Sequence, residues 1–509
     1  MYLERLLQVG NMALAVAIAM HLLAIILFLK QYKKAALFLL VCGAAVLRYY
    51  FTELDIFLHD WDERFHALVA ANLSKHLLKP TLLDEPLLGY YPDSWVSSHV
   101  WLHKQPLFLW QMALSIKVFG RNEFALRLPS LIQTSLLVAV IYDLGKQVAS
   151  ERTGFLAAVL LSMYQPMLDM VGGLYGMDHN DVAFCFYITL SLWSWVRFEK
   201  SRQPAWLFAA GVFSGGAVLV KWLTGLLLFF CMAVYHLLKR NLFTKDVLLQ
   251  ITGTFLLAVL VFLPWQLYVF HTYPVEAFFE FKYNARHFTE VLEGHGAEKE
   301  YYFNQLKFHY KMLQAFIFVG MAGAFWQFRQ NVFLVTFIAG IAAVYAFFTM
   351  AESKLWNYPM MVMPLMLLFL ALGLNYILDL LPGRQWSGLL FAAVTITAGF
   401  WMLDAPKIYE EHFSNYNWNA PFRNAKSPNA VIMKKWAASL PPDAIVANFP
   451  SMSEIDFMFY SNRTAFGSLN HDQLLKLLKL NRPIYWVNTP PPASYGLNDR
   501  LRFLPEHIQ

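Results

Sequence analysis

Three carboxylates lie within four residues where a loop begins after the second strongly apolar segment: Asp60, Asp62 and Glu63. Acids this close can hold a cation, or one of them can act as a general base because like charge raises its pKa. The alternative is a solvated helix N-terminus, where acids interact favourably with the helix dipole. Spacing alone leaves both interpretations open.

A second acidic motif, Asp178-His179-Asn180-Asp181, opens a later apolar segment. Its two aspartates are three residues apart and so share one helical face. The alternative is helix capping by Asn180 or Asp181. Two acidic clusters that each lie at the end of an apolar segment indicate a site more specifically than either does alone.

Cations also lie near the ends of apolar segments: Lys104, Lys221, Arg286 and Lys354. Recognition of a phosphate at a membrane surface needs such charges, with arginine as a bidentate donor and lysine as a point charge. For each cation alone, the alternative is a side chain that extends to the lipid headgroups. The loop histidines, His66 among them, show no metal-ligand spacing.

The composition defines the elements that must position these residues. The chain has 509 residues, 58% of them hydrophobic and 15% charged, whereas soluble domains carry about 25% charged residues. Since a crossing helix needs ~20 apolar residues, we expect about twelve transmembrane helices. The predicted spans are 10–29, 35–53, 128–148, 154–171, 180–198, 204–220, 222–238, 247–270, 312–328, 331–350, 358–379 and 386–403.

The basic residues predict the orientation. With Lys30, Lys33 and Lys34 in the cytoplasm, every alternate loop is basic, as the positive-inside bias requires. The first span is then retained, with its N-terminus outside. Lys221 lies at the tip of a hairpin, and all the acids and cations above face the extracytoplasmic side. This charge pattern indicates membrane orientation and gives no nucleic-acid footprint.

The first outer loop, 54–127, contains two apolar runs with helical spacing, 63–78 and 106–119, which suit helices lying along the membrane interface. After Asp404 no span-length apolar run follows. There we predict helices at 429–440 and 470–480, with strands at 443–449 and 483–488. The predicted fold is an all-α polytopic membrane domain, 1–403, followed by a small extracytoplasmic α/β domain, 404–509.

Several motifs in consistent order across about residues 35–380 resemble the GT-C superfamily of glycosyltransferases. The closest likeness is to the bacterial aminoarabinose transferases that act on lipid A and to the protein O-mannosyltransferases. The motifs are Trp61-Asp62-Glu63, Lys104-Gln105-Pro106-Leu107, Phe119-Gly120-x-x-Glu123 with Arg127-Leu128-Pro129, the acids at Asp178–Asp181, Lys221, Arg286, and Ser353-Lys354-Leu355 with Tyr358-Pro359. Gln105 departs from the family, which usually has a proline there.

The resemblance implies inverting transfer of one sugar from a polyprenyl-phosphate donor on the outer face. Asp62 would act as the base and Glu63 would position the acceptor or a cation, while Asp178 or Asp181 would orient a substrate. Lys104 and Arg286, with Lys221 and Lys354, would bind the donor phosphate. We also predict that His66, Arg127 and Tyr358 contact substrate.

The acceptor stays open among lipid A, another glycan and a protein hydroxyl. No cofactor is assigned, and a divalent cation is kept as an alternative. We expect a bacterial inner-membrane location in contact with membrane lipids. The rival functions are a transporter or lipid-carrier flippase, a structural membrane protein, and a polymerase or ligase of polyprenyl-diphosphate glycans. Transporters tend to show related halves and charges near the midplane, and this sequence shows neither.

Overall fold

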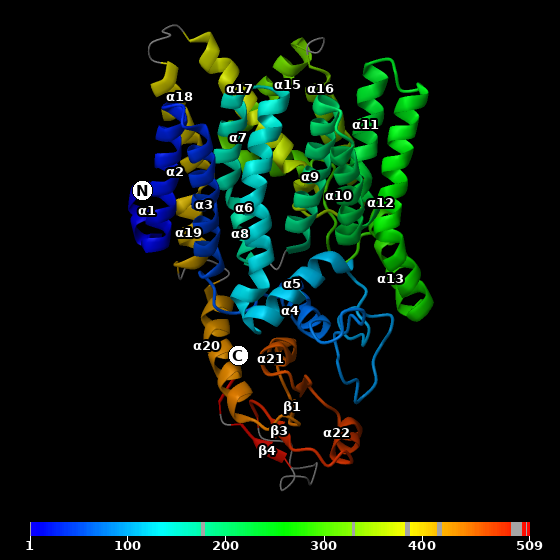
Figure 1. Ribbon diagram of the computed structural model, residues 1–509. Coiled ribbons are helices and arrows are strands. Elements are labelled where there is room, and N and C mark those ends of the chain that lie inside the picture. The colour runs from blue at the N-terminus through cyan, green and yellow to red at the C-terminus, as the bar shows by residue number, and fades with distance from the viewer. Residues whose placement is uncertain are drawn as a thin grey trace.

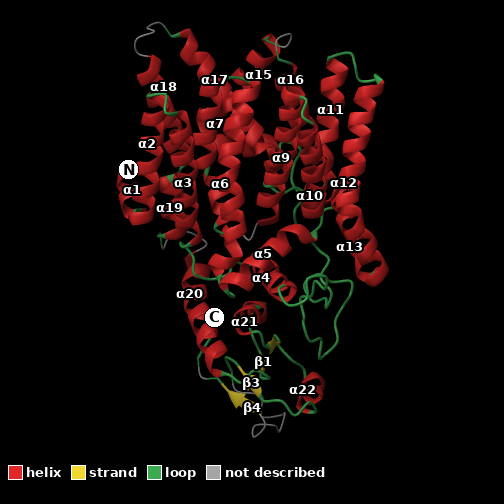
Figure 2. Ribbon diagram, in the orientation of Figure 1, coloured by secondary structure: helices red, strands yellow, loops and turns green. Residues whose placement is uncertain are grey.

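A bundle of long helices forms most of the molecule, and a smaller region containing a β-sheet lies beyond one end of it (Figure 1). The computed structural model describes residues 2–174, 179–327, 331–381, 387–414, 420–489, 501–504 and 506–508. Figure 2 shows that the bundle is helical and that the strands are confined to the C-terminal region. The largest buried core lies between the bundle helices and continues into the C-terminal region, where it includes Met433, Trp436 and Phe457.

The bundle helices and the short helices that connect them follow one another along most of the chain. They are α1 (Tyr2–Val9), α2 (Met12–Leu29), α3 (Lys33–Thr52), α6 (Glu123–Val148), α7 (Glu151–Ser162), α8 (Gln165–Val171), α9 (His179–Ser201), α10 (Pro204–Lys221), η2 (Trp222–Leu226), α11 (Leu227–Leu238), α12 (Lys245–Thr272), α13 (Pro274–Thr289), α14 (Tyr301–Tyr310), η3 (Lys311–Leu313), α15 (Gln314–Trp326), α16 (Val332–Met350), η4 (Tyr358–Val362), α17 (Met363–Leu380) and α18 (Ser387–Met402).

Among the described residues, eight helices are long and apolar enough to cross a membrane, or nine if the bent pair α7 and α8 forms one span. The protein is thus an integral membrane protein, but the predicted count of twelve is not confirmed. The α9 helix and the short α15 helix fall outside this set. The predicted span 154–171 is broken: α7 and α8 meet at 48°. Pro166 lies in the first turn of α8, where it cannot continue the preceding helix.

The predicted hairpin around Lys221 is supported by contacts at both ends of α9. At the C-terminal end of α9, Glu199 pairs with Arg202, just before α10, and lies 3.6 Å from His236 near the end of α11. At the opposite end of α9, Asp181 pairs with Lys221. The chain therefore reverses at η2, and the two ends of 204–238 lie at the same end of the bundle.

Basic residues from separate turns meet at one end of the bundle, as the orientation prediction requires. Lys33 and Lys146 both pair with Glu151, and Arg152 lies 3.5 Å from Asp379. The first outer loop and the C-terminal region lie at the opposite end (Figure 1). Two of the basic residues used for the prediction, Arg329 and Arg384, lie outside the described residues.

Two short helices close this opposite end: α4 (Asp62–Leu73) and α5 (Pro106–Phe119). The predicted bounds of α5 are confirmed; Pro106 starts it and Gly120, with φ +85°, ends it. The other predicted helix, 63–78, is shorter than expected. It is also not a surface helix with one exposed face, because every residue from Glu63 to Leu73 is buried. The C-terminal region covers α4 on the side away from the bundle.

After α18, the short helix α19 (Ala405–His412) packs beside α1 within the bundle. The C-terminal region comprises α20 (Ala420–Ser439), α21 (Ser453–Ser461), α22 (His471–Leu478) and the strands β1 (Ile445–Ala447), β2 (Thr464–Ala465), β3 (Ile484–Trp486) and β4 (Leu501–Phe503). The strands form one parallel sheet in the order β2-β1-β3-β4, with Ile445 opposite both Thr464 and Ile484. The two predicted strands and both predicted helices are present; β2, β4 and α21 were not predicted.

Candidate active site

The candidate site forms around the first turn of α4. Asp62 begins this helix, and its carboxylate lies 3.3 Å from the Lys104 ammonium. Both side chains are about one-fifth exposed. Burial alone would raise the pKa of Asp62, but the charge of Lys104 lowers that pKa to about 2. The predicted pairing of an outer-loop acid with Lys104 is thus present, and Asp62 is ionised at neutral pH.

A second polar cluster forms where α9, α10 and η4 meet. The Asp181 carboxylate pairs with the Lys221 ammonium and accepts a 2.7 Å hydrogen bond from the Asn357 amide. The same ammonium lies 4.8 Å from the centre of the Tyr358 ring, in cation–π geometry. Asp181 and Asn357 are almost fully buried, at 3% and 1% exposure. These contacts hold Lys221 at the hairpin tip.

Tyr358 connects the two clusters. Its phenol is close enough to Lys104, Asp62 and Asp181 to feel the charge of all three. Five predicted site residues from four separate parts of the chain therefore lie in one neighbourhood: Asp62, Lys104, Asp181, Lys221 and Tyr358. This is the spatial arrangement on which the sequence-based hypothesis depends.

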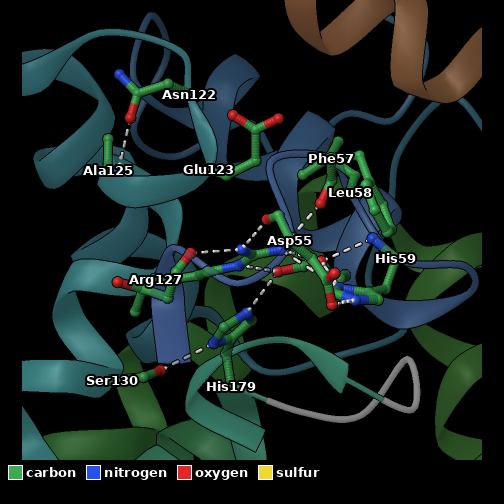
Figure 3. Close-up of polar contacts among 12 residues, drawn as sticks. Asp55, Phe57, Leu58, His59, Asn122, Glu123, Ala125, Arg127, Ser130 and His179 are labelled. Carbon is green, nitrogen blue, oxygen red and sulfur yellow. Dashed lines mark hydrogen bonds and ion pairs between the residues drawn. The ribbon is translucent and has the colours of Figure 1, made fainter. Parts of the chain in front are cut away.

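Glu63, next to Asp62 in sequence, forms a fully buried clamp with Arg127. Figure 3 shows Arg127 pointing toward Asp55, with His59 and His179 nearby. Arg127 donates to both Glu63 oxygens, at 2.8 and 3.1 Å. It also donates to the carbonyl oxygens of Thr52, Asp55 and Phe57, at 2.8, 2.6 and 2.9 Å. All of these groups are withdrawn from solvent, so the two residues predicted to handle substrate hold the entry to α4 in place.

Histidines complete the clamp from two sides. His59 lies 2.7 Å from Glu63 and 3.1 Å from Asp55, and His179 lies 3.4 Å from Glu63. Burial would lower the pKa of His59, but the adjacent carboxylates raise it. Burial would raise the pKa of Glu63, but Arg127 and His59 hold it well below its usual range. Glu63 and Arg127 therefore form a charged pair at neutral pH.

His66 lies one turn after Asp62 and is fully buried. Its ring packs edge-on against Trp101 and Phe108, with centroids 5.9 and 4.9 Å away. Burial lowers the pKa of His66 to about 3, so the imidazole is neutral. Neither ring nitrogen has a hydrogen-bond partner among the described residues. His66 thus lies directly behind the Asp62–Lys104 pair, in an apolar environment.

Two predicted phosphate ligands occupy other environments. Arg286 is half-exposed on α13 and pairs with Glu290 one turn further on, at 2.7 Å. Lys354 is buried, and its ammonium donates to the Ala351 carbonyl at 2.6 Å. No contact described here joins either cation to Asp62 or Lys221. Asp178 lies outside the described residues.

The 271–311 loop contributes residues that the sequence did not suggest. His103, next to Lys104, lies 3.2 Å from Glu280 and stacks on Trp95 at 4.6 Å. Glu293 accepts hydrogen bonds from Trp95 and Tyr283, at 2.9 and 2.7 Å. The sequence did offer one sign of Glu280. In α13, Glu276 and Glu280 lie four residues apart, on the helix face opposite Phe278. Asn357 could be found only as the neighbour of Tyr358.

One group of side chains among the described residues has spacing suitable for a metal ion: Asp169, Glu411 and His412. The Lys407 ammonium already lies 3.1 Å from Asp169 and 3.6 Å from Glu411. Because this ammonium supplies the positive charge that a metal would bring, we assign the group to a buried ion-pair cluster. The divalent cation considered from the sequence stays a prediction without an assigned site.

The helical bundle, the closing helices α4 and α5 and the parallel C-terminal sheet define an integral membrane protein with the GT-C fold. The structure is similar to that of ArnT from Cupriavidus metallidurans bound to undecaprenyl phosphate, with a TM-score of 0.61 and 14% identity over 91% of this chain and 88% of that one. It is also similar to the archaeal oligosaccharyltransferase AglB from Archaeoglobus fulgidus, with a TM-score of 0.52 and 13% identity over 85% of this chain and 64% of that one.

Residues 103–268 match the model of the dolichyl-phosphate-mannose-protein mannosyltransferase family. The chain is also similar to curated undecaprenyl phosphate-alpha-4-amino-4-deoxy-L-arabinose arabinosyl transferases. One from Pseudomonas fluorescens is 27% identical over 59% of this chain, and that match spans 55% of the relative's length. One from Pseudomonas aeruginosa is 25% identical over 83% of this chain and 81% of its own length. The chain thus has the GT-C fold and is similar in sequence to the aminoarabinose transferases.

Proposed function

We propose that this protein is an inverting glycosyltransferase that moves one sugar from a polyprenyl-phosphate donor to an acceptor hydroxyl on the extracytoplasmic face of the membrane. The observation that carries the proposal is the 3.3 Å pair between Asp62 and Lys104, part-exposed at the end of the bundle. The likeness to enzymes named for undecaprenyl-phosphate sugars supports the donor class. The acceptor is a lipid, glycan or protein hydroxyl.

Donor binding would change the partner of Lys104. A phosphate attracts the ammonium, so Lys104 would move its charge from Asp62 towards the phosphate oxygens. Loss of the neighbouring cation raises the pKa of a carboxylate. Asp62, whose pKa is about 2 in the paired state, would then become a stronger base when the donor is in place.

The proposed reaction is a single displacement at the anomeric carbon. Asp62 takes the proton of the acceptor hydroxyl, whose oxygen forms the new bond to that carbon on the face opposite the phosphate. The bond from the anomeric carbon to the phosphate oxygen breaks, and its electron pair stays on that oxygen. Lys104 stabilises the developing charge, and Lys221, held by Asp181 and Tyr358, is the second cation available nearby.

The remaining sequence-based predictions stand as parts of this proposal. Residues 1–403 form the transferase domain and residues 404–509 an extracytoplasmic domain, in a bacterial inner membrane. Arg286 would serve as a phosphate ligand only after leaving Glu290, and Lys354 only after leaving the Ala351 carbonyl. Glu63 and Arg127 would act by orienting the first turn of α4 rather than by contacting substrate.

The test is a transfer assay with purified protein in lipid nanodiscs, a panel of radiolabelled polyprenyl-phosphate sugars and membrane extract as the acceptor source. We expect labelled product from the native chain and none from Asp62→Asn or Lys104→Met. Lys75→Met is the matched control, because Lys75 pairs with Asp84 in the same loop. Full transfer by Asp62→Asn would exclude the base assignment. Lipid movement across vesicles without sugar transfer would favour a flippase.

A further inference from the structure

The segment that leads into Asp62 is held by cations from two directions. On the bundle side, Arg127 donates hydrogen bonds to the carbonyl oxygens of Asp55 and Phe57. On the other side, α20 supplies Lys434, whose ammonium lies 3.3 Å from the Ile56 carbonyl, and Lys426, 3.1 Å from the Leu58 carbonyl. Four consecutive carbonyls, 55 to 58, are thus held alternately by the bundle and by the C-terminal region.

Each of these lysines makes a second contact that fixes its position. Lys426 lies 2.7 Å from the Asp60 carboxylate, and Lys434 lies 2.9 Å from Glu123 at the start of α6. Lys426 is 15% exposed, so its ammonium is largely withdrawn from competing water. A lysine placed between a carboxylate and a backbone carbonyl restrains both groups.

The restrained segment ends in a strained residue. Trp61 has φ +59° and ψ −123°, a conformation that residues other than glycine rarely adopt. Such a backbone conformation is unfavourable and persists only when its surroundings impose it. The Trp61 side chain is 58% exposed, so packing of its ring does not impose it. The contacts on both sides of the segment do, and Asp62 is the next residue.

A second attachment lies just after Asp62. Arg64 pairs with Asp60 and lies 3.1 Å from Asp456 on α21, and it donates to the Ser451 carbonyl at 3.0 Å. Asp60 therefore joins Lys426 of α20 to Arg64 of α4. The C-terminal region thus contacts the chain both before and after Trp61.

We infer that Lys426 and Lys434 are positioning residues through which the C-terminal region holds the Trp61 turn so that the Asp62 carboxylate faces Lys104. The inference rests on the proposed function for its effect on catalysis. Without the lysines, the 56–60 segment relaxes, Trp61 moves to negative φ, and the Asp62 carboxylate turns away from Lys104. The domain beyond residue 404 then contributes to the reaction without touching substrate.

The kinetic test compares Lys426→Gln with Arg482→Gln in the full chain. Arg482 pairs with Glu85 at 2.7 Å, so it also joins the C-terminal region to the first outer loop, but away from residues 55–61. We expect Lys426→Gln to lower kcat at least tenfold with little change in KM for the donor, and Arg482→Gln to leave both unchanged. Lys426→Arg, which can still reach the carbonyl and the carboxylate, restores kcat to within about threefold.

The variant Trp61→Gly distinguishes two possible roles of Lys426: positioning Asp62, or only attaching the C-terminal region to the bundle. Because glycine adopts positive φ without strain, Trp61→Gly removes the conformational tendency that the lysines oppose. We therefore expect Trp61→Gly to recover most of the kcat lost in Lys426→Gln. Equal loss of kcat in the single and double variants, or equal loss in Arg482→Gln, would overturn the inference.

A measurement independent of activity distinguishes failure of this inference from failure of the proposed function. Cysteines at positions 62 and 104 report whether the two side chains face each other, through the rate of coupling by a short bis-thiol reagent, with coupled peptides identified by mass spectrometry. We expect Lys426→Gln to slow coupling at least fivefold and Arg482→Gln to leave it unchanged. An unchanged rate in Lys426→Gln overturns the inference, whether or not the native chain transfers sugar.

Discussion

Asp62 and Glu63 are adjacent carboxylates in one helical turn, yet they belong to two different regions of the molecule. Successive residues of a helix point about 100° apart. Asp62 therefore faces the part-exposed pair with Lys104, whereas Glu63 faces the bundle and is 1% exposed among Arg127, His59 and His179. The residue type is shared, and the environment assigns the role.

Asp62 and Glu63 show how a reactive carboxylate differs from a structural one. A substrate can replace the partner of Asp62, but it cannot replace the buried partners of Glu63. A phosphate or hydroxyl can approach Asp62 because its side chain is 18% exposed. Glu63 is enclosed by buried partners that leave no room for a substrate, and a methyl group on Gly173 would lie 2.1 Å from its Oε1. Variants at these two positions should therefore separate activity from stability.

The largest effect is expected from breaking the buried clamp with Arg127→Met. This change removes the guanidinium partner of the buried Glu63 carboxylate and leaves three carbonyls without their donor. Loss of one partner of a buried ion pair costs about 3–5 kcal/mol. We expect a large drop in thermal stability and yield of the purified protein, measured by melting in detergent.

The control for this prediction is Arg152→Met at the opposite end of the bundle. Arg152 is 40% exposed and lies 3.5 Å from Asp379, which is 66% exposed. An exposed pair of this kind contributes about 0–1 kcal/mol, so its melting temperature should hardly change. If Arg127→Met melts like Arg152→Met, the clamp does not stabilise the fold.

The next effect, on activity alone, is expected from Asp62→Asn. Loss of a general base costs about 10²–10⁴-fold in rate, while the isosteric amide preserves helix α4. We expect kcat to fall by that amount and the melting temperature to stay within about 2 °C, because the pair is part-exposed and contributes about 0–1 kcal/mol. A parallel loss of stability would place Asp62 with Glu63 among the structural residues.

A smaller, pH-dependent effect is expected at a third carboxylate. Glu454 at the start of α21 is largely buried, and burial raises its pKa to about 7. The folded state then holds a proton that the unfolded state loses near pH 4.5, so the stabilising effect is complete below pH 4.5 and is lost as pH rises through 7. We expect Glu454→Gln to be more stable than the native chain at pH 8, by about 1–3 kcal/mol.

The control for this prediction is the pH dependence of the stability that Glu454→Gln gains over the native chain. Melting curves at pH 5 and pH 8 should show little difference between variant and native chain at the lower pH and a clear one at the higher pH. Arg64 lies near this carboxyl. Because salt screens buried charges little, added salt should change the stability gain of Glu454→Gln only slightly. A gain of equal size at both pH values would mean that Glu454 does not titrate there.

The sequence allowed much of this fold to be predicted because hydrophobic length and basic residues act locally. The apolar run and Gly120 defined α5 to the residue, and the charge pattern placed Lys221 at a hairpin tip. The failures came from long-range packing. The run 154–171 has the composition of one span, but Pro166 breaks it. The α4 segment looks amphipathic in the sequence because the C-terminal region that covers it is far away along the chain, with Arg64 and Ser451 387 residues apart.

For the site, motif position identified which residues gather but not what each one does. Asp62 and Lys104 were predicted to meet, and they do. Glu63 and Arg127 belong to the same motifs, yet only the path of the backbone from Thr52 to Phe57 explains their clamp. Glu280 and Glu293 depend on how α13 packs against the first outer loop, which no local pattern encodes.

The smallest effect is expected at Arg286. Of the predicted phosphate ligands, it has the environment least like that of Lys104, because it is half-exposed and paired with another residue. Its side chain is 48% exposed and already engaged with Glu290 at the end of α13, at 2.7 Å, and an exposed pair of this kind stabilises the fold little. Arg286→Ala should leave the melting temperature unchanged. It should raise KM for the donor less than tenfold, because Lys104 remains and Arg286 must first give up its partner. Glu290→Ala is the sharper probe: if Arg286 binds phosphate, removing its competitor lowers KM for the donor, whereas an unchanged KM assigns Arg286 to the surface of α13 and leaves phosphate recognition to the cations around Asp62.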